Sequence, residues 1–135
     1  MLYVLLAGAV FSAPSCKKFV EQQKENAMVD IVTKGTWRIS RYTDHQTDIT
    51  ASFSGYAFQF KTDGTVDGIL GGQTTAGTWA GDVDARTIRS EFPAAGDPLD
   101  KLNHTWQVTD SYTDSVSART LLEDTIYNYL ELHKN

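Results

Sequence analysis

The clearest indication of fold class in this chain of 135 residues is Tyr56-Ala57-Phe58-Gln59-Phe60-Lys61-Thr62-Asp63-Gly64-Thr65. Its aromatic side chains at positions 56, 58 and 60 alternate with Ala57, Gln59 and Lys61. This two-residue period is typical of an antiparallel strand with one buried and one solvated face. Asp63-Gly64 follows, and Asp-Gly between apolar alternations favours a tight turn. The stretch therefore predicts a β-hairpin with aromatic side chains directed to a core.

The same two-residue period recurs along the chain after Gly35. Trp37, Ile39 and Arg41 share one face of the first predicted strand, and Gly71-Gly72 marks a later turn. Strands separated by turn signals about every 8–12 residues are typical of a small barrel or sandwich, and a barrel leaves no open edge. A helical turn is expected over 99–103. The predicted strands cover 36–41, 56–61, 65–70, 73–80, 86–92, 104–110, 115–121 and 125–134.

One helix is predicted before the strands, from Lys17 to about Thr33. Its apolar side chains recur at three- and four-residue spacing, and Lys34-Gly35 supplies a stop because Gly adopts the left-handed conformation readily. We expect this helix to pack on one end of the β domain or to act as a spacer; a helix that binds a partner is the alternative. Its apolar face contains Val20, Ala27, Met28, Ile31 and Val32.

The only cysteine, Cys16, follows an apolar run over residues 2–11 and the small residues Ser12, Ala13 and Ser15. An apolar run of this length is typical of a secretory signal peptide and is too short to span a bilayer. We therefore expect a lipoprotein signal at 1–15, cleavage before Cys16 and lipid attachment to its thiol. Ordinary cleavage near Ala13-Pro14-Ser15 and a buried apolar strand with a core cysteine are the alternatives.

Removal of residues 1–15 leaves 120 residues, enough for one modest core. The expected organisation is a signal peptide at 1–15, a lipidated cysteine with a helix at 16–34, and a β domain at 35–135. The net charge of -5, without a basic cluster, argues against nucleic acid as a partner. The expected location is the cell envelope, with the lipid anchor in the outer membrane. The sequence does not indicate which leaflet of that membrane holds the anchor.

The order of several motifs resembles the lipocalin-like lipoproteins common in Bacteroidetes. The resemblance covers about residues 17 to 134 and implies an all-β, small antiparallel barrel of about eight strands behind one N-terminal helix. It also implies, at most, binding of a small apolar molecule. The chain has no Thr-Asp-Tyr motif. The motifs are Gly35-Thr36-Trp37, Phe60-Lys61-Thr62-Asp63-Gly64-Thr65, Gly77-Thr78-Trp79, Leu102-Asn103-His104-Thr105-Trp106 and Tyr129-Leu130-Glu131-Leu132.

Six aromatic residues are candidates either for a ligand pocket or for the core. Pockets are mostly apolar and aromatic, yet a barrel of about eight strands is just wide enough for its side chains to fill it. Both interpretations stay open for Trp37, Tyr56, Phe58, Phe60, Trp79 and Trp106.

Chemistry-bearing motifs are few. His45, His104 and His133 have no metal-site spacing, and Asp63 to Gly68 lacks the later carboxylate of a calcium loop, so no metal or cofactor is expected. No nucleophile elbow or phosphate loop is present, which argues against an enzyme. An enzyme would be favoured only if His45 or His104 converged with acidic side chains in a cleft. Ser115 and Thr125 lie in Asp-Ser/Thr-apolar patterns resembling Bacteroidetes O-glycosylation sites.

Two functional hypotheses remain. The first is a non-catalytic, membrane-anchored barrel that binds a small hydrophobic ligand. The second is an interaction or structural module with a solid core, which binds an envelope protein or a glycan through exposed Tyr42, Tyr112 and Tyr127.

Overall fold

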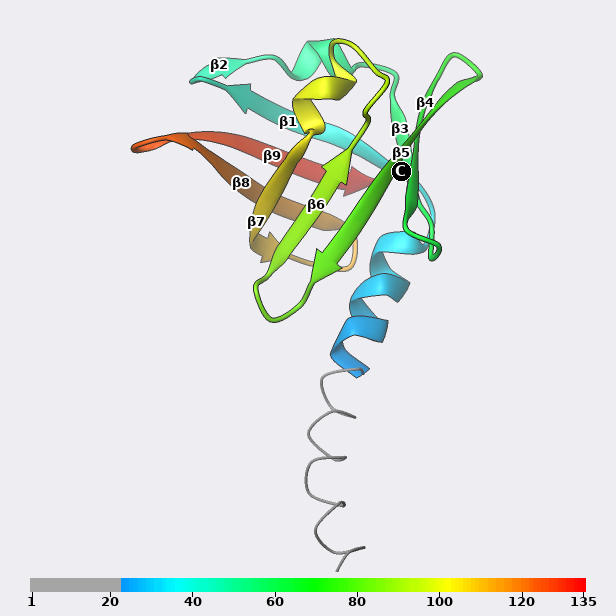
Figure 1. Cartoon of the computed structure of the whole chain (residues 1–135). Coiled ribbons are helices and arrows are strands. Elements are labelled where there is room, and N and C mark those ends of the chain that lie inside the picture. Colours follow the sequence, from blue (N-terminus) through cyan, green and yellow to red (C-terminus); the bar gives the residue numbers. More distant parts are fainter. Residues whose placement is uncertain (1–22) are drawn as a thin grey trace, which may run out of the picture.

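The protein folds as a closed antiparallel β-barrel with one helix at its N-terminal side (Figure 1). The computed structural model describes residues 23–135, so the predicted signal peptide, Cys16 and the start of the helix lie outside the described residues. Strands β3 to β9 pair in sequence order, and β9 pairs back with β1 to close the barrel. The strands are β1 Trp37–Asp44, β2 Thr47–Asp48, β3 Ala57–Phe60, β4 Thr65–Leu70, β5 Gln73–Asp82, β6 Thr87–Glu91, β7 His104–Ser111, β8 Ser115–Glu123 and β9 Ile126–Lys134.

The predicted all-β barrel of eight main strands is confirmed. The predicted hairpin around Asp63-Gly64 is also confirmed, as strands β3 and β4. Phe60 pairs with Val66 across the β3–β4 turn, and the Gly64 amide donates to the Lys61 carbonyl at 3.2 Å. The Asp63 carboxylate accepts hydrogen bonds from the Thr65 amide at 3.0 Å and from its hydroxyl at 2.6 Å. Asp63 thus fixes a turn, as Asp commonly does through its own backbone.

The first strand contains a bulge that corrects two predictions. The β1–β9 register shifts between Ile39 and Arg41, which inserts an extra residue and reverses the inside-outside alternation beyond it. Arg41, predicted on the face of Trp37, is therefore exposed. Tyr42, predicted as an exposed aromatic, is 0% exposed.

The N-terminal helix, described over residues 23–33, packs its C-terminal half on one end of the barrel (Figure 1). Val32 is buried, and Met28 and Ile31 pack against the core, whereas Ala27, predicted on the same face, is exposed. The Trp37 indole N–H donates to the Val32 carbonyl at 2.9 Å and so satisfies a carbonyl at the helix end. No described helix is long and apolar enough to cross a membrane.

Two short 3-10 helices cover the opposite end of the barrel: η1 (Thr50–Phe53) and η2 (Leu99–Leu102). The second matches the helical turn predicted near 99–103. The first contributes Phe53, whose ring stacks on Tyr42 with centroids 5.2 Å apart. Both therefore place apolar side chains over the core at that end, which is far from the N-terminal helix in Figure 1.

Candidate functional site

An apolar pocket of about 440 Å³ lies between the N-terminal helix and the adjacent end of the barrel. Small-molecule sites are usually concave, apolar and about 300–1,000 Å³ in volume. The helix, the β5–β6 hairpin and strands β7 and β8 all contribute to its wall. Its aliphatic and methionine side chains are Met28, Ile31, Val32, Val83, Ile88, Val108 and Val116.

A glycine in β5 lets the helix approach this wall closely. Gly81 has no side chain, and a Cβ built there would lie 2.5 Å from the terminal methyl group (Cε) of Met28. Met28 therefore occupies space that any other residue at position 81 would fill. The side chain of Met is flexible, which suits a wall that adapts to its contents.

The rim of the pocket is polar and carries one charge of each sign. Asp82 ends β5 and Arg86 is the last residue of the four-residue loop between β5 and β6, and both line the pocket. Tyr112, in the β7–β8 turn, also lines it and is 66% exposed, as predicted for an accessible aromatic. The remaining polar lining residues are Thr87, Ser111 and Thr113.

The six predicted aromatic residues lie in the core of the barrel or pack against it, and none of them lines this pocket. Five are buried; Tyr56 is half-buried and stacks on Phe58 with centroids 5.8 Å apart. The barrel interior leaves only about 40 Å³ among the side chains that line it. These residues are therefore core, and the core interpretation of Trp37, Tyr56, Phe58, Phe60, Trp79 and Trp106 is the one that their positions favour.

The buried indoles are fixed by hydrogen bonds as well as by packing. The Trp79 indole N–H donates to the Lys61 carbonyl at 2.8 Å, and that of Trp106 donates to the Leu102 carbonyl at 3.3 Å. Lys134 at the end of β9 places its ammonium nitrogen 5.1 Å from the centre of the Trp37 ring. A cation at this distance is attracted to the face of an indole.

Sequence reasoning missed most of the pocket. The apolar face of the helix was predicted, and it supplies Met28, Ile31 and Val32. Val83, Val108 and Val116 gave no distinct signal, because isolated valines in strands and turns are common. These three valines lie together at one end of the barrel only because of the register in which the strands pair.

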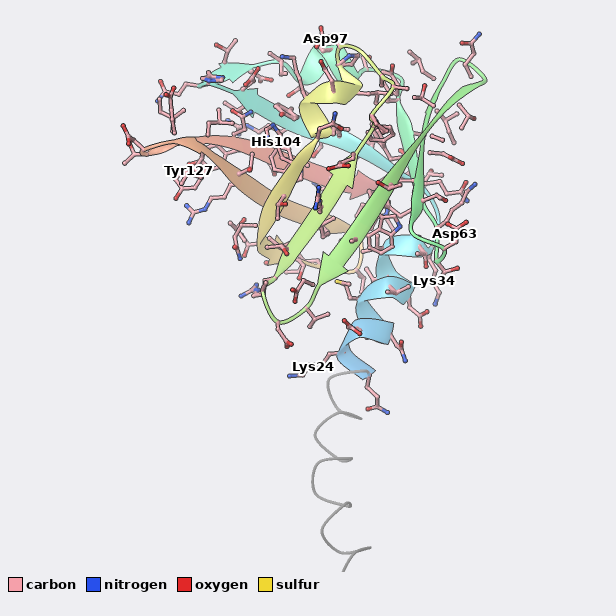
Figure 2. All side chains as sticks on the ribbon, viewed as in Figure 1. Lys24, Lys34, Asp63, Asp97, His104 and Tyr127 are labelled. Carbon is pink, nitrogen blue, oxygen red and sulfur yellow. The ribbon has the colours of Figure 1, made fainter. Side chains whose placement is uncertain are left out.

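A polar cluster lies at the opposite end of the barrel, centred on the carboxylate of Asp44. Its oxygens are 2.9 Å from Nδ1 of His45, 3.2 Å from Nζ of Lys101 and 3.0 Å from Nδ2 of Asn128. Figure 2 labels Asp97 at this end of the barrel and Lys24 in the N-terminal helix. The Oδ1 atom of Asp97 lies 3.9 Å from Nζ of Lys101. The Lys101 ammonium thus lies within ion-pair distance of both Asp44 and Asp97.

The environment of the cluster shifts several pKa values. Burial of Asp44 opposes ionisation, but hydrogen bonds from His45, Lys101 and Asn128 outweigh it and lower its pKa. Hydrogen bonding to Asp44 raises the pKa of Lys101. Burial, only partly offset by the hydrogen bond from Asn128, raises the pKa of Tyr42 to about 12.

The two histidines whose convergence with acids in a cleft would have favoured an enzyme, His45 and His104, do not line the pocket. His45 contacts Asp44 in the exposed β1–β2 turn, while His104 packs edge-to-face on Trp106 with ring centroids 5.5 Å apart. Burial lowers the pKa of His104. Across residues 23–135, no group of three or more His, Cys, Asp or Glu side chains is arranged to hold a metal ion.

The two predicted glycosylation residues lie at opposite ends of strand β8. Ser115 begins β8 and is partly buried; Thr125 is exposed in the β8–β9 turn. On the outer face of β8 and β9, Arg119 lies 4.4 Å from the centre of the Tyr127 ring, and Leu121 and Tyr129 are about half exposed.

Comparison with known proteins supports the fold and no finer assignment. No family model and no curated protein matches the chain. Its fold is similar to the crystal structure of a DUF4847 family protein from Bacteroides vulgatus ATCC 8482, with a TM-score of 0.56 and 16% identity. The similarity covers 80% of this chain and 97% of that one. At this identity, the likeness shows a shared small β-barrel.

Proposed function

We propose that the protein is a non-catalytic lipoprotein of the cell envelope that holds a small apolar molecule in the pocket beside its N-terminal helix. The observation that carries this proposal is the pocket itself, with its volume of about 440 Å³ and its wall of aliphatic and methionine side chains. Removal of apolar surface from water supplies the binding free energy. The fold and motif order resemble lipocalin-like lipoproteins of Bacteroidetes.

The proposed site differs from the deep cavity of a true lipocalin. The interior of this barrel holds about 40 Å³ of free space, which is too little for such a ligand. The ligand would instead lie between the helix and the barrel end, where Met28 and Val108 face the same pocket. A helix that docks on a barrel can create a pocket that the barrel alone does not contain.

The proposed anchor places this pocket near a membrane. Residues 17–22 separate Cys16 from the described helix, and a chain of that length reaches at most about 25 Å. The helix leaves the barrel at the end that carries the pocket (Figure 1). A lipid on Cys16 would therefore keep the pocket end of the barrel close to the bilayer, from which an apolar ligand could enter. The proposed membrane is the outer membrane, and the proposal assigns neither leaflet.

The non-catalytic assignment rests on the separation of apolar and polar chemistry. The Asp44 cluster is at the far end of the barrel, and its members hydrogen-bond to one another. The pocket lining contains no histidine and no cysteine. An apolar ligand against the aliphatic wall would thus lie away from Asp82, Arg86 and Tyr112, the titratable groups of the lining, which are on the rim.

The experiment that tests the proposal uses Met28 as a reporter. The chain has two methionines, Met1 and Met28, and Met28→Leu assigns the signal of the second. With methyl-labelled methionine, titration with decanol should shift the Met28 methyl resonance in a saturable way. Val108→Phe should abolish the shift because the added ring occupies the pocket.

The matched control is Thr109→Phe, which adds the same ring at an exposed position of the same strand. It should leave the decanol titration unchanged. Thermal unfolding of both variants checks that each remains folded. A Met28 resonance that stays unmoved in the wild type, or that moves equally in the Val108→Phe variant, would refute the pocket as the binding site.

A second candidate function is supported by the outer face of β8 and β9. Arg119 pairs with Tyr129 and Leu121 pairs with Tyr127 across the two strands. Exposed Tyr and Arg are enriched at protein interfaces. If the pocket proved empty, this face would be the candidate binding surface for an envelope protein or a glycan. A nucleic acid is not proposed as a partner, because the chain is acidic.

A further inference from the structure

The pocket rim holds two opposite charges that do not neutralise each other. Asp82 and Arg86 are four positions apart and both line the pocket, yet neither takes part in any of the five ion pairs among the described residues. An exposed ion pair adds little or nothing to stability, so the two side chains lose little by staying apart and available to a ligand. Here each charge faces the pocket separately.

Hydrogen bonds of the β5–β6 loop hold both residues in place. One carboxylate oxygen of Asp82 accepts the Ala85 amide at 3.0 Å, and the other oxygen is left for a ligand. Arg86 has a φ of 56°, in the left-handed region that a non-glycine residue seldom adopts. Its carbonyl accepts the Val108 amide at 2.8 Å, which ties the loop to β7. The side chains therefore start from fixed backbone positions.

We infer that the pocket takes a single-chain amphiphile whose head carries one anion and one cation, such as a phosphate and an ammonium group. This inference rests on the proposed function. The alkyl chain would lie against Met28 and Val108, the phosphate would face Arg86, and the ammonium would face Asp82. Thr87, Ser111 and Thr113 line the same pocket, and hydroxyl groups of this kind can donate to phosphate oxygens.

A head with a single charge fits this rim less well. A purely anionic head would attract Arg86 but would be repelled by Asp82 and by the net charge of -5. A purely cationic head would meet Asp82 but would leave Arg86 facing a like charge. Only a head with both charges places an opposite charge beside each residue, and it enters without a net charge.

The test compares decyl amphiphiles that differ only in the head. Decylphosphocholine, decyl phosphate and decyltrimethylammonium are titrated below their micelle concentrations into the whole chain carrying Cys16→Ser, with the Met28 methyl resonance as readout. We expect the zwitterion to bind about twofold to fivefold more tightly than either singly charged probe, since one exposed charge contact is of that size.

Two variants separate the roles of the charges while preserving the loop. Asp82→Asn keeps an oxygen for the Ala85 amide, and Arg86→Asn suits the left-handed backbone because Asn tolerates it. Asp82→Asn should shift the preference toward decyl phosphate, and Arg86→Asn should shift it toward decyltrimethylammonium. Both variants should weaken decylphosphocholine binding.

The outcomes distinguish this inference from the proposed function. If decanol and all three charged probes fail to move Met28, the pocket itself is refuted. If decanol binds but the three heads bind equally, or if the two variants leave their order unchanged, the zwitterion inference is overturned while the apolar pocket stands. A strict preference of the wild type for one singly charged probe also overturns it.

Discussion

Gly35 and Gly77 each begin a Gly-Thr-Trp tripeptide, but they are glycines for different reasons. Gly35 has a φ of +71° and open space around the position of a Cβ, so only its backbone conformation favours glycine. At Gly77 a Cβ would overlap the Glu91 carbonyl oxygen and would lie 2.7 Å from Cδ1 of Phe92. The shared tripeptide therefore does not reflect a shared structural role.

Substitution of the two glycines should separate these roles. Gly77→Ala should lower the free energy of unfolding by about 3 kcal/mol because β5 and β6 must move apart. Gly35→Ala should lower it by about 1 kcal/mol, the cost of the left-handed conformation alone. Urea unfolding measures both. Equal losses would contradict the crowding argued for Gly77.

His104 gives the barrel a pH-dependent stability with a defined sign. Burial lowers its pKa in the folded state below the ordinary value, so the unfolded chain binds the proton first as the pH falls. Stability should fall from about pH 6.5 downward and level off below the folded pKa. His104→Gln, which does not titrate, should show a smaller loss between about pH 7 and 5. Identical slopes in urea unfolding at several pH values would exclude this role.

At the scale of elements, the contact of β1 with β9 closes the barrel, and one buried amide joins their ends. The Asn128 side chain accepts the His45 amide at 2.9 Å and donates to Asp44 at 3.0 Å. It is 2% exposed. Buried polar groups left without partners cost more than the hydrogen bond itself contributes.

Removal of this amide should weaken closure of the barrel. Asn128→Ala should lower the free energy of unfolding by about 2–3 kcal/mol, because the His45 amide and the Asp44 carboxylate lose a partner. The control is Asn135→Ala, which removes an exposed amide hydrogen bond to Thr36 and should cost less than about 1 kcal/mol. Thermal unfolding of the two variants compares them. A loss at Asn135 as large as that at Asn128 would contradict the closing role.

Elements with a strong local pattern were predicted, and those without one were not. The main strands have alternating apolar residues and Gly or Asp turns between them. Strand β2 is only Thr47–Asp48, both exposed, and its turn has His45 and Gln46 at positive φ without a glycine. Neither feature leaves a signal in the sequence, since tight turns of this kind usually contain Asn or Gly.

At the scale of the whole molecule, the helix links a proposed anchor to a proposed pocket. Its C-terminal half packs on the core, while its N-terminal part leads toward Cys16. An anchor near the pocket end would orient the Asp44 end and η2 away from the bilayer. This arrangement depends on lipid attachment, which can be tested directly.

Cys16→Ser should release the chain from membranes. Lipid chains contribute about 0.8 kcal/mol per buried CH2, and two or more chains anchor firmly, whereas serine offers no thiol for attachment. Detergent-phase partitioning and intact mass of the expressed chain measure the change. Ser15→Ala, with the thiol intact, should stay in the detergent phase. A wild-type chain without added lipid mass would refute the anchor.

The fold class, the approximate strand positions and the helix before them could all be predicted from the residues alone. These follow from periodicity and turn chemistry, which act over a few residues and are visible in one chain. Three features became visible only in the folded molecule: Tyr42 points inward, five of the six aromatic residues are buried in the core, and a pocket lies beside Met28. Such features depend on a bulge, on strand register and on the volumes of side chains far apart in sequence, so no local pattern encodes them.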